Sequence, residues 1–421
     1  MIFRFSLYGF LRNQRYFEPF LILAFLQVGL SFFEIGLLIA FRELWVNVLE
    51  IPSGAIADLY GRRRSLIFSF AAYIVGFLTF GFTDQFAFFF VAMFFLAVGD
   101  AFRTGTHKAM IFTWLRLQGR TDERTKVYGF TRSWSKIGAA VSALIAAAFV
   151  LVTDSYTLVF FLAAVPYVGN IINFLGYPAE LEGEREVHPG PQAVLVHMRE
   201  SLRAAFGAGG LRRLVLESMG FEGVFHAVKD YLQPMLLAVA VSGAAGIAFS
   251  DDLSEVQQSA LLIGPAYFVL HMLSSAASRN AYRVANAAGS EDHAARWMWG
   301  MAVVLFAVIL AAGVADVPAV LILAFIALSA LQDLWRPVLI ARFDEHSNEA
   351  QGATVLSIES QARRFATMIL APLMGLAVDA AQGGSIGGPF WPLGAVGLVA
   401  AILFFLTAAR RPSSVAAQGS A

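Results

Sequence analysis

Charged side chains stand inside long apolar runs of this sequence, where they could bind a charged solute or carry protons. Residues 213–241 form one such run and contain Glu222, His226 and Lys229 at helical spacing, with Asp230 at the edge of the stripe. A buried carboxyl group gains a proton more readily than an exposed one, and an imidazole titrates near neutral pH. We therefore expect Glu222 and His226 to exchange protons, and Lys229 to be an anion partner or a fixed countercharge.

A second polar group lies in the run 87–112. Asp100, Arg103, Thr104 and His107 follow the i, i+3, i+4, i+7 spacing that places side chains on one helix face. Asp100 is a third candidate for titration, Arg103 is a candidate anion partner, and His107 belongs to the same predicted site.

The pair Asp333 and Arg336 repeats the i, i+3 pattern of Asp100 and Arg103. Arg336 is another candidate anion partner. Each pair could also neutralise itself and hold neighbouring helices together, so the functional and structural interpretations of both pairs stay open.

Three further carboxylates are secondary candidates. Glu43 and Glu50 share a helix face with Asn47. Glu18 follows Arg15 by three residues, and we expect these two to pair near the start of their apolar run.

The composition indicates that lipid surrounds the elements that carry these groups. Of the 421 residues, 58% are hydrophobic and 14% are charged, and the mean hydropathy is +0.66. Soluble domains average about 45–50% apolar and about 25% charged residues. An ionisable group at the bilayer centre costs about 2.5–3.5 kcal/mol or more, so these groups should face a cavity.

The charge balance and the lack of cysteine exclude several kinds of site. The formal net charge is zero, which gives no basic excess for nucleic-acid binding. Cysteine is absent, which excludes disulfides and thiolate metal sites.

Runs of about 20 mostly apolar residues predict transmembrane helices. Residues 1–15 are interrupted by Arg4 and Arg12 and are expected to lead into the first span rather than to form a signal peptide. Twelve spans are predicted at residues 11–31, 35–57, 65–82, 87–112, 132–152, 157–177, 213–241, 259–278, 295–313, 318–341, 354–379 and 389–409.

Basic residues occur in the loops of only one side of this arrangement. The loops that contain residues 62–64, Arg120, Arg283 and Arg342 fall on that side, and the six opposite loops contain no Lys or Arg. Positive charge stays cytoplasmic, so both termini are predicted to be cytoplasmic.

A polar stretch divides the spans into two equal halves. We predict an N-terminal six-helix bundle over 1–178, a cytoplasmic linker over 179–212 and a C-terminal six-helix bundle over 213–421. Within the linker, residues 192–206 have the pattern of an amphipathic helix on the membrane surface. The matched pairs Asp100–Arg103 and Asp333–Arg336 favour an internal duplication.

A short motif follows the second predicted span. Gly54, Asp58, Gly61, Arg62 and Arg63 match the pattern Gly-x-x-x-Asp-basic-x-Gly-Arg-basic, on the predicted cytoplasmic side. In these residues the chain resembles the major facilitator superfamily, although position 59 is Leu where the family often has a basic residue. The resemblance in topology covers essentially the whole chain.

The resemblance implies an all-α membrane protein with twelve transmembrane helices in two six-helix bundles. Spans one, four, seven and ten would line a central cavity. Asp58 would latch onto the start of span eleven in the outward-open state, and Arg62 and Arg63 would pair with nearby acidic residues. Gly54 permits close helix approach and Gly61 permits a tight turn.

The function expected from these patterns is secondary active transport of a small polar or charged solute by alternating access, coupled to protons. Three alternatives stay open: a drug or metabolite exporter of the same superfamily, a divalent-metal transporter, and a membrane sensor or enzyme. The Gly-Pro antiporter motif of many drug exporters is absent from 138–148, and no metal-ligand spacing, nucleophile constellation or phosphate-binding loop is present.

We therefore predict no enzymatic activity, no cofactor and no metal site. The expected partners are the solute, protons and the lipid bilayer, and the protein is expected to be a monomer. Arginine outnumbers lysine and alanine is abundant, which favours the cytoplasmic (inner) membrane of a bacterium with a GC-rich genome.

Overall fold

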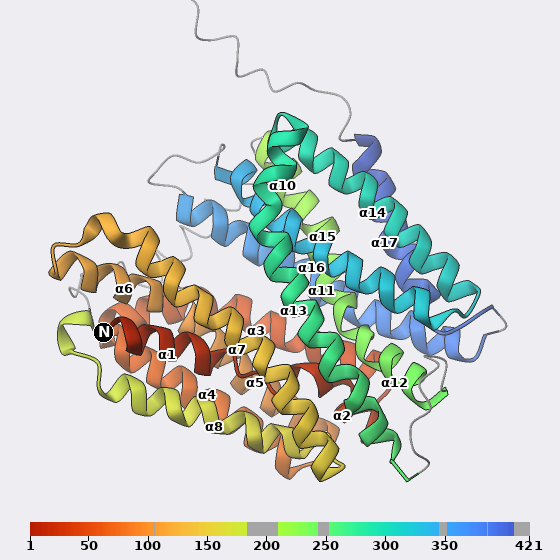
Figure 1. Cartoon of the computed structure of the whole chain (residues 1–421), viewed down its shortest axis with the longest axis horizontal. Coiled ribbons are helices and arrows are strands. Elements are labelled where there is room, and N and C mark those ends of the chain that lie inside the picture. The colour runs from red at the N-terminus through yellow and green to blue at the C-terminus, as the bar shows by residue number, and fades with distance from the viewer. Residues whose placement is uncertain (105, 183–208, 243–251, 345–351, 385, 408–421) are drawn as a thin grey trace, which may run out of the picture.

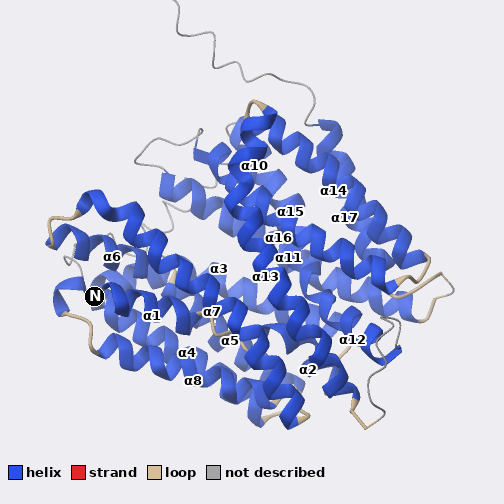
Figure 2. Ribbon diagram, viewed as in Figure 1, coloured by secondary structure: helices blue, strands red, loops and turns tan. Residues whose placement is uncertain are grey.

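Two bundles of helices make up the described part of the chain in this computed structural model (Figure 1). The structure describes residues 1–104, 106–182, 209–242, 252–344, 352–384 and 386–407. Within these ranges the secondary structure is helical throughout, with loops and turns between the helices (Figure 2). The all-α class predicted from the sequence is confirmed.

The N-terminal bundle contains the helices before residue 183. Its elements are α1 (Ile2–Arg12), η1 (Glu18–Phe20), α2 (Leu21–Gln27), α3 (Phe32–Tyr60), α4 (Arg62–Phe82), α5 (Phe86–Arg103), α6 (Thr106–Leu117), η2 (Thr121–Glu123), α7 (Arg124–Thr153), α8 (Leu158–Leu175) and η3 (Ala179–Glu182).

The C-terminal bundle contains the helices from residue 209 onward. Its elements are α10 (Gly209–Ser218), η4 (Met219–Gly223), α11 (Val224–Val228), η5 (Lys229–Tyr231), α12 (Leu232–Ser242), α13 (Glu255–Ala288), α14 (Glu291–Val314), α15 (Pro318–Asp344), α16 (Gly352–Gln382) and α17 (Trp391–Thr407). The predicted amphipathic helix at 192–206 lies outside the described residues.

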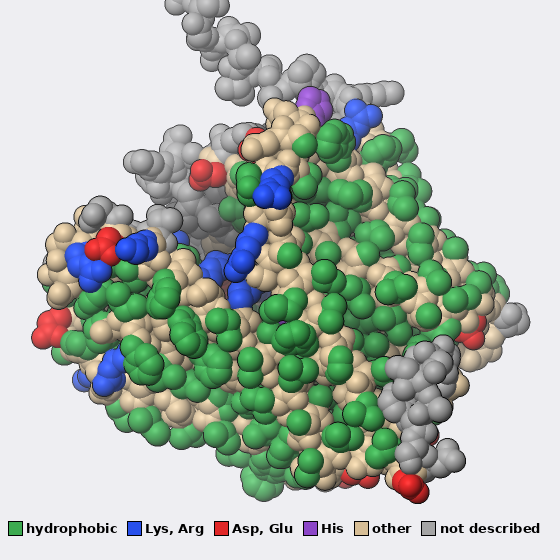
Figure 3. Space-filling view, viewed as in Figure 1, with side chains coloured by type: hydrophobic (Ala, Val, Ile, Leu, Met, Phe, Trp, Pro, Cys, Tyr) green, Lys and Arg blue, Asp and Glu red, His purple; other side chains and the backbone are tan. Residues whose placement is uncertain are grey.

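Eight helical segments in the described ranges are long and apolar enough to cross a membrane. The other four predicted spans have identifiable irregularities: the first and seventh are broken, α3 carries charged residues, and α17 has only 17 residues. Apolar side chains are spread over the face shown in Figure 3 and charged ones gather at a few places, as expected for a protein in lipid.

The helix α1 already occupies Ile2–Arg12, so the residues predicted to lead into the first span are themselves helical. The chain breaks after α1 and resumes with η1 and α2. Arg4, which interrupts the apolar run near the start of the sequence, has a hydrogen-bond partner inside the bundle. It donates to the carbonyl oxygen of Asn173 at 3.0 Å. Arg15 lies in the break between α1 and η1, and Glu18 is the first residue of η1.

The fourth and seventh spans also depart from a regular α-helix. Thr104 has an extended backbone (φ −60°, ψ 129°) that separates α5 from α6, so His107 leaves the helix face of Asp100. The seventh span contains a π-helical turn at η4 and a 3-10 turn at η5. Such breaks place backbone polar groups and charged side chains beside a cavity.

The two bundles touch backbone to backbone on the side of the molecule opposite residues 62–64, and α3 and α16 stay in contact as far as the Glu50–Arg364 pair. We call the side of residues 62–64 the arginine side and the other the opposite side. At the opposite side α3 packs on α16 with almost no space, because a Cβ at Gly375 would lie 2.2 Å from the Phe32 carbonyl oxygen. Helix α7 meets α13 nearby, where Gln257 donates to the carbonyl oxygen of Leu151 at 2.9 Å.

Candidate functional site

Two adjoining pockets lie beside one another in the region between the bundles. The central cavity, of about 340 Å³, has walls from both bundles, and the basic chamber, of about 580 Å³, lies mainly among α1, α6 and α7. Arg12, Arg15, Glu18 and Arg103 line both. Figure 3 shows basic side chains bordering the hollow between the two bundles.

Charged residues dominate the lining of this joint space. Ten lining residues are basic: Arg12, Arg15, Arg42, Arg103, Lys108, Arg132, Lys136, Lys229, Arg363 and Arg364. Four are acidic: Glu18, Glu43, Asp100 and Asp230. His107 and His271 face the basic chamber, and His226 faces the central cavity.

On the N-terminal wall, Asp100 is the centre of a hydrogen-bonded network. Its carboxylate accepts hydrogen bonds from Arg42 and from the Tyr73 hydroxyl. Arg103 lies 3.6 Å from the same carboxylate, so the predicted i, i+3 pair forms but shares its acid with Arg42. Asp100 therefore neutralises two cations at the cavity surface.

The break in the first span places a charged pair at the cavity. Arg15 Nη1 lies 3.2 Å from the Glu18 carboxylate, which confirms the predicted pairing. The side-chain nitrogen Nε2 of Gln233 donates a hydrogen bond to the Glu18 carbonyl oxygen at 2.8 Å. The side-chain oxygen Oε1 of Gln233 accepts one from the Ile22 backbone N–H, also at 2.8 Å. Gln233 thus joins the broken first and seventh spans across the bundle interface.

The C-terminal wall contains the predicted stripe of the seventh span. Lys229 and Asp230 pair at 2.7 Å and line the central cavity together with His226. Glu222 lies behind that wall with 1% of its surface exposed, where its carboxylate accepts from Gln332 at 3.0 Å. The His226 ring nitrogen Nε2 is 3.8 Å from Glu222, so the imidazole separates the buried carboxylate from the cavity.

Arg336 faces the interior of the C-terminal bundle. It forms a bidentate pair with Glu359 of α16, at 2.5 and 2.8 Å, and lies 3.9 Å from Glu222. Within the described residues it forms no ion pair with Asp333, so the self-neutralising interpretation that the sequence left open does not apply to this pair. The reason is that α16 presents a carboxylate closer to the guanidinium than Asp333 does.

Helix α16 also supplies charged residues that the sequence analysis missed. Arg364 lines the cavity and crosses to the N-terminal bundle, where it pairs with Glu50 at 2.7 Å and lies 3.7 Å from Glu43. Arg363 lies 4.0 Å from Glu359. The secondary candidates Glu43 and Glu50 therefore take part in contacts between the bundles.

His107 lies in the basic chamber, apart from Asp100. Its ring stacks on Tyr8 with centroids 3.8 Å apart, and its Nε2 is buried without a hydrogen-bond partner. Lys108 lies above the rings of Phe112 and Tyr128, at 5.5 and 5.6 Å from their centroids.

The motif after the second span forms a tight turn against the end of the N-terminal bundle. Gly61 has φ +98°, a conformation that favours glycine. Arg63 lies 3.2 Å from Glu182 and donates to the Tyr177 carbonyl oxygen, and Arg62 donates to Thr113 at 3.3 Å.

Two motif residues contribute less to the described contacts. A Cβ at Gly54 would meet no atom within 4 Å, so no close helix approach occurs there in this conformation. The side chain of Asp58 lies outside the described residues, and its latch onto span eleven stays a prediction.

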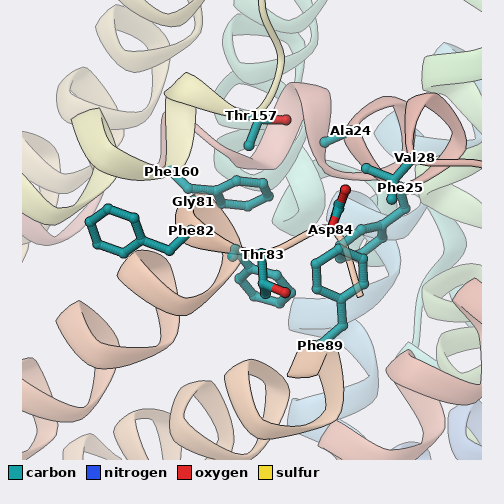
Figure 4. Close-up of a pocket in the computed structure, with 11 residues that line it drawn as sticks. Ala24, Phe25, Val28, Gly81, Phe82, Thr83, Asp84, Phe89, Thr157 and Phe160 are labelled. Atoms are coloured by element: carbon teal, nitrogen blue, oxygen red, sulfur yellow. The ribbon is translucent and has the colours of Figure 1, made fainter. Parts of the chain in front are cut away.

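A separate pocket opens at the opposite side within the N-terminal bundle. It has a volume of about 270 Å³ and is lined by phenylalanine rings and Asp84, whose carboxylate points toward Ala24 and Val28 (Figure 4). None of the predicted site residues faces it. Across the described residues, no three metal-ligating side chains converge on one point.

Residues 13–285 match the family model described as Major Facilitator Superfamily. A curated relative, an uncharacterized MFS-type transporter, YxaM, of Bacillus subtilis (strain 168), is 26% identical over 232 residues. That alignment spans 52% of this chain and 54% of the relative, so the chain matches about half the length of that protein.

Solved structures match the fold over nearly the whole chain. The nucleoside transporter NupG has a TM-score of 0.76 at 10% identity, covering 97% of this chain and 98% of its own. A D-xylose-proton symporter has a TM-score of 0.68 at 14% identity, covering 96% of each chain. A bacterial homolog of the human lysosomal transporter Spinster, inward-facing and unoccupied, has a TM-score of 0.69 at 14% identity, covering 97% of this chain and 94% of its own.

Proposed function

The chain belongs to the major facilitator superfamily and is a secondary transporter, and from this premise we propose that it moves a small polar or charged solute by proton-coupled alternating access. It is an integral multi-pass membrane protein and not an enzyme. We further propose that it acts as a monomer in the cytoplasmic membrane of a bacterium.

The observation that carries the proposal is a charged cavity between bundles that touch at the opposite side. Contacts at Gly375 and Gln257 seal that side, whereas the cavity adjoins the basic chamber among α1, α6 and α7. With the arginine side cytoplasmic, this is an inward-facing arrangement. Rocking the bundles about the cavity would expose the same residues to the other side.

Proton coupling is proposed for Glu222 and His226. The imidazole faces the cavity and the carboxylate lies 3.8 Å behind it, so a proton can pass between solvent in the cavity and a buried acid. Asp100 is bound by Arg42, Tyr73 and Arg103, and we assign it to holding the N-terminal wall in place.

The test begins with identification of the solute by thermal-shift screening of the purified protein against metabolite and drug panels at two pH values. Uptake of that solute is then measured in proteoliposomes with and without a pH gradient. Glu222→Gln is expected to abolish the acceleration by the gradient, because the amide cannot take up a proton. Glu255→Gln, an exposed position at the start of α13, is the control and should leave coupling intact. Full coupling in Glu222→Gln would remove this residue from the mechanism.

A further inference from the structure

Arg12, the last residue of α1, is a buried cation without a counterion. Only 7% of its surface is exposed, and its Nε and Nη1 atoms are buried with no hydrogen-bond partner. Within the described residues, no carboxylate lies within 4.0 Å of its guanidinium. Arg12 lines both the central cavity and the basic chamber, so its side chain stands at the boundary of the two spaces, with Nε and Nη1 covered by protein.

Charges of both signs surround Arg12. Glu18 and Asp100 attract it from beyond salt-bridge distance, but each carboxylate has a closer cation as its partner. Arg15 and Arg103 act on it as like charges, and their own acidic partners are Glu18 and Asp100. The end of the α1 dipole favours a cation, but that interaction does not satisfy two buried N–H groups. A buried charge normally has an ionic or hydrogen-bonded partner, and leaving it unpaired is costly.

The basic chamber extends this excess of positive charge. Lys108, Arg132 and Lys136 line it, and within the described residues none of them forms an ion pair at salt-bridge distance. Lys108 contacts two aromatic rings, and Asp333 acts on Lys136 from a greater distance. Glu18 is the one acidic residue among the described residues that line the chamber.

We propose that the transported solute is an organic anion, and that Arg12 binds its carboxylate or phosphate group. The planar guanidinium presents two parallel N–H donors that fit either group. The rings of Phe5, Tyr8 and Tyr128 line the adjoining chamber and would contact an apolar body. The combined space suits a metabolite-sized molecule. This inference rests on the proposed function and specifies its substrate class.

The test compares four probes of similar shape on purified full-length protein in detergent. Benzoate and phenyl phosphate carry the proposed anionic groups, benzamide is neutral and benzylamine is cationic. We expect the anions to raise the melting temperature in a concentration-dependent and salt-sensitive way, and the other two probes to leave it unchanged. A ligand that binds only the folded protein raises its melting temperature, so the shift reports binding directly.

Substitutions of Arg12 then test whether its side chain binds the anion. Arg12→Gln should raise the concentration of anion needed for half the shift by at least about tenfold. Arg12→Lys keeps the charge but loses the paired donors, and an intermediate loss is expected. Arg4→Gln is the matched control, because it removes another arginine of α1 that contacts Asn173 outside the cavity. It should bind the anions as the wild type does.

Each outcome separates this inference from the proposed function. If no anion shifts the melting temperature, or if Arg12→Gln and Arg12→Lys both bind like the wild type, the anion site is wrong. If a pH gradient drives transport of a neutral or cationic solute only, the substrate class is wrong and the proposed function stands. If anions bind through Arg12 but a pH gradient has no effect on their transport, the coupling is wrong and the anion site stands.

Discussion

Asp100 holds three side chains of the N-terminal wall. Its carboxylate accepts from Arg42 and Tyr73 and lies 3.6 Å from Arg103. Removing the carboxylate from this part-buried network leaves its cations uncompensated, at a cost below the roughly 3–5 kcal/mol of a fully buried pair because solvent in the cavity screens them. The residue therefore determines whether α3, α4 and α5 keep their charged faces together beside the cavity.

Asp100→Asn is expected to lower the melting temperature of the purified protein by several degrees, because the amide keeps the size of the side chain but not its charge. Differential scanning fluorimetry at neutral pH measures the effect. Asp84→Asn, in the loop before α5, is the control and should change little. A wild-type melting temperature in Asp100→Asn would mean that Arg42 and Arg103 do not depend on this carboxylate.

Sequence periodicity identified several charged residues of the cavity wall but not the depth at which each one lies. Asp100, Arg103, His226, Lys229 and Asp230 face the central cavity as a group. Glu222, Asp333 and Arg336 were predicted to belong to this site but do not line the central cavity. Periodicity shows which helix face a residue lies on, but it does not show which neighbouring helix covers that face.

Some residues of the site that periodicity did not identify still have a signal in the sequence. Glu359, Arg363 and Arg364 stand within the predicted eleventh span at spacings of four and one, which is unusual in a membrane helix. Arg12 was assigned to the lead-in because a charge interrupts an apolar run. Its burial depends on α1 folding back among other helices, which local sequence does not encode.

Among the elements, the start of α3 and the end of α16 are joined by hydrogen bonds at the opposite side. Both carboxylate oxygens of Asp379 in α16 accept hydrogen bonds from the backbone N–H groups of Phe32 and Phe33, at 3.0 and 2.8 Å. These are the first two residues of α3, whose N–H groups have no partner within their own helix. Asp379 thus caps a helix of the other bundle, and the cap exists only while the opposite side is closed.

Asp379→Ala should weaken this closure. Loss of a helix cap costs about 1 kcal/mol, which corresponds to about a fivefold shift toward opening at that side. Since the natural chain has no cysteine, Leu21→Cys provides a single reporter in the central cavity. We expect a membrane-impermeant maleimide added at the opposite side to label it faster in Asp379→Ala, and not in the control Asp84→Ala. Equal labelling rates would show that the cap does not hold the closed state.

The spans themselves were largely predictable, since apolar length is a strong signal in a membrane protein. Helices α13, α14 and α15 contain the predicted spans 259–278, 295–313 and 318–341. The breaks at Thr104 and between α1 and η1 were not predicted. Gly105 directly follows Thr104, and Pro19 lies in the first turn of η1, so a glycine or a proline stands beside each break in the sequence.

At the scale of the whole molecule, transport requires the two bundles to close one side while the other opens. The present closure depends on helices that touch backbone to backbone at Gly36 and Gly375 between α3 and α16, and on close packing at Gly264 between α13 and α7. Packed interfaces of this kind have discrete arrangements rather than continuous ones. A side chain inserted at the contact should therefore select the alternative arrangement.

Gly375→Leu tests this directly. A Cβ there would lie 2.2 Å from the Phe32 carbonyl oxygen, and backbone cannot yield as a flexible side chain can. We expect the variant to keep its fold, measured by size-exclusion chromatography, but to lose transport and to expose the Leu21→Cys reporter to maleimide from the opposite side. Gly129→Leu on α7, where a Cβ meets nothing within 4 Å, should behave like the wild type. Full transport by Gly375→Leu would mean that α3 and α16 need not touch for the bundles to alternate.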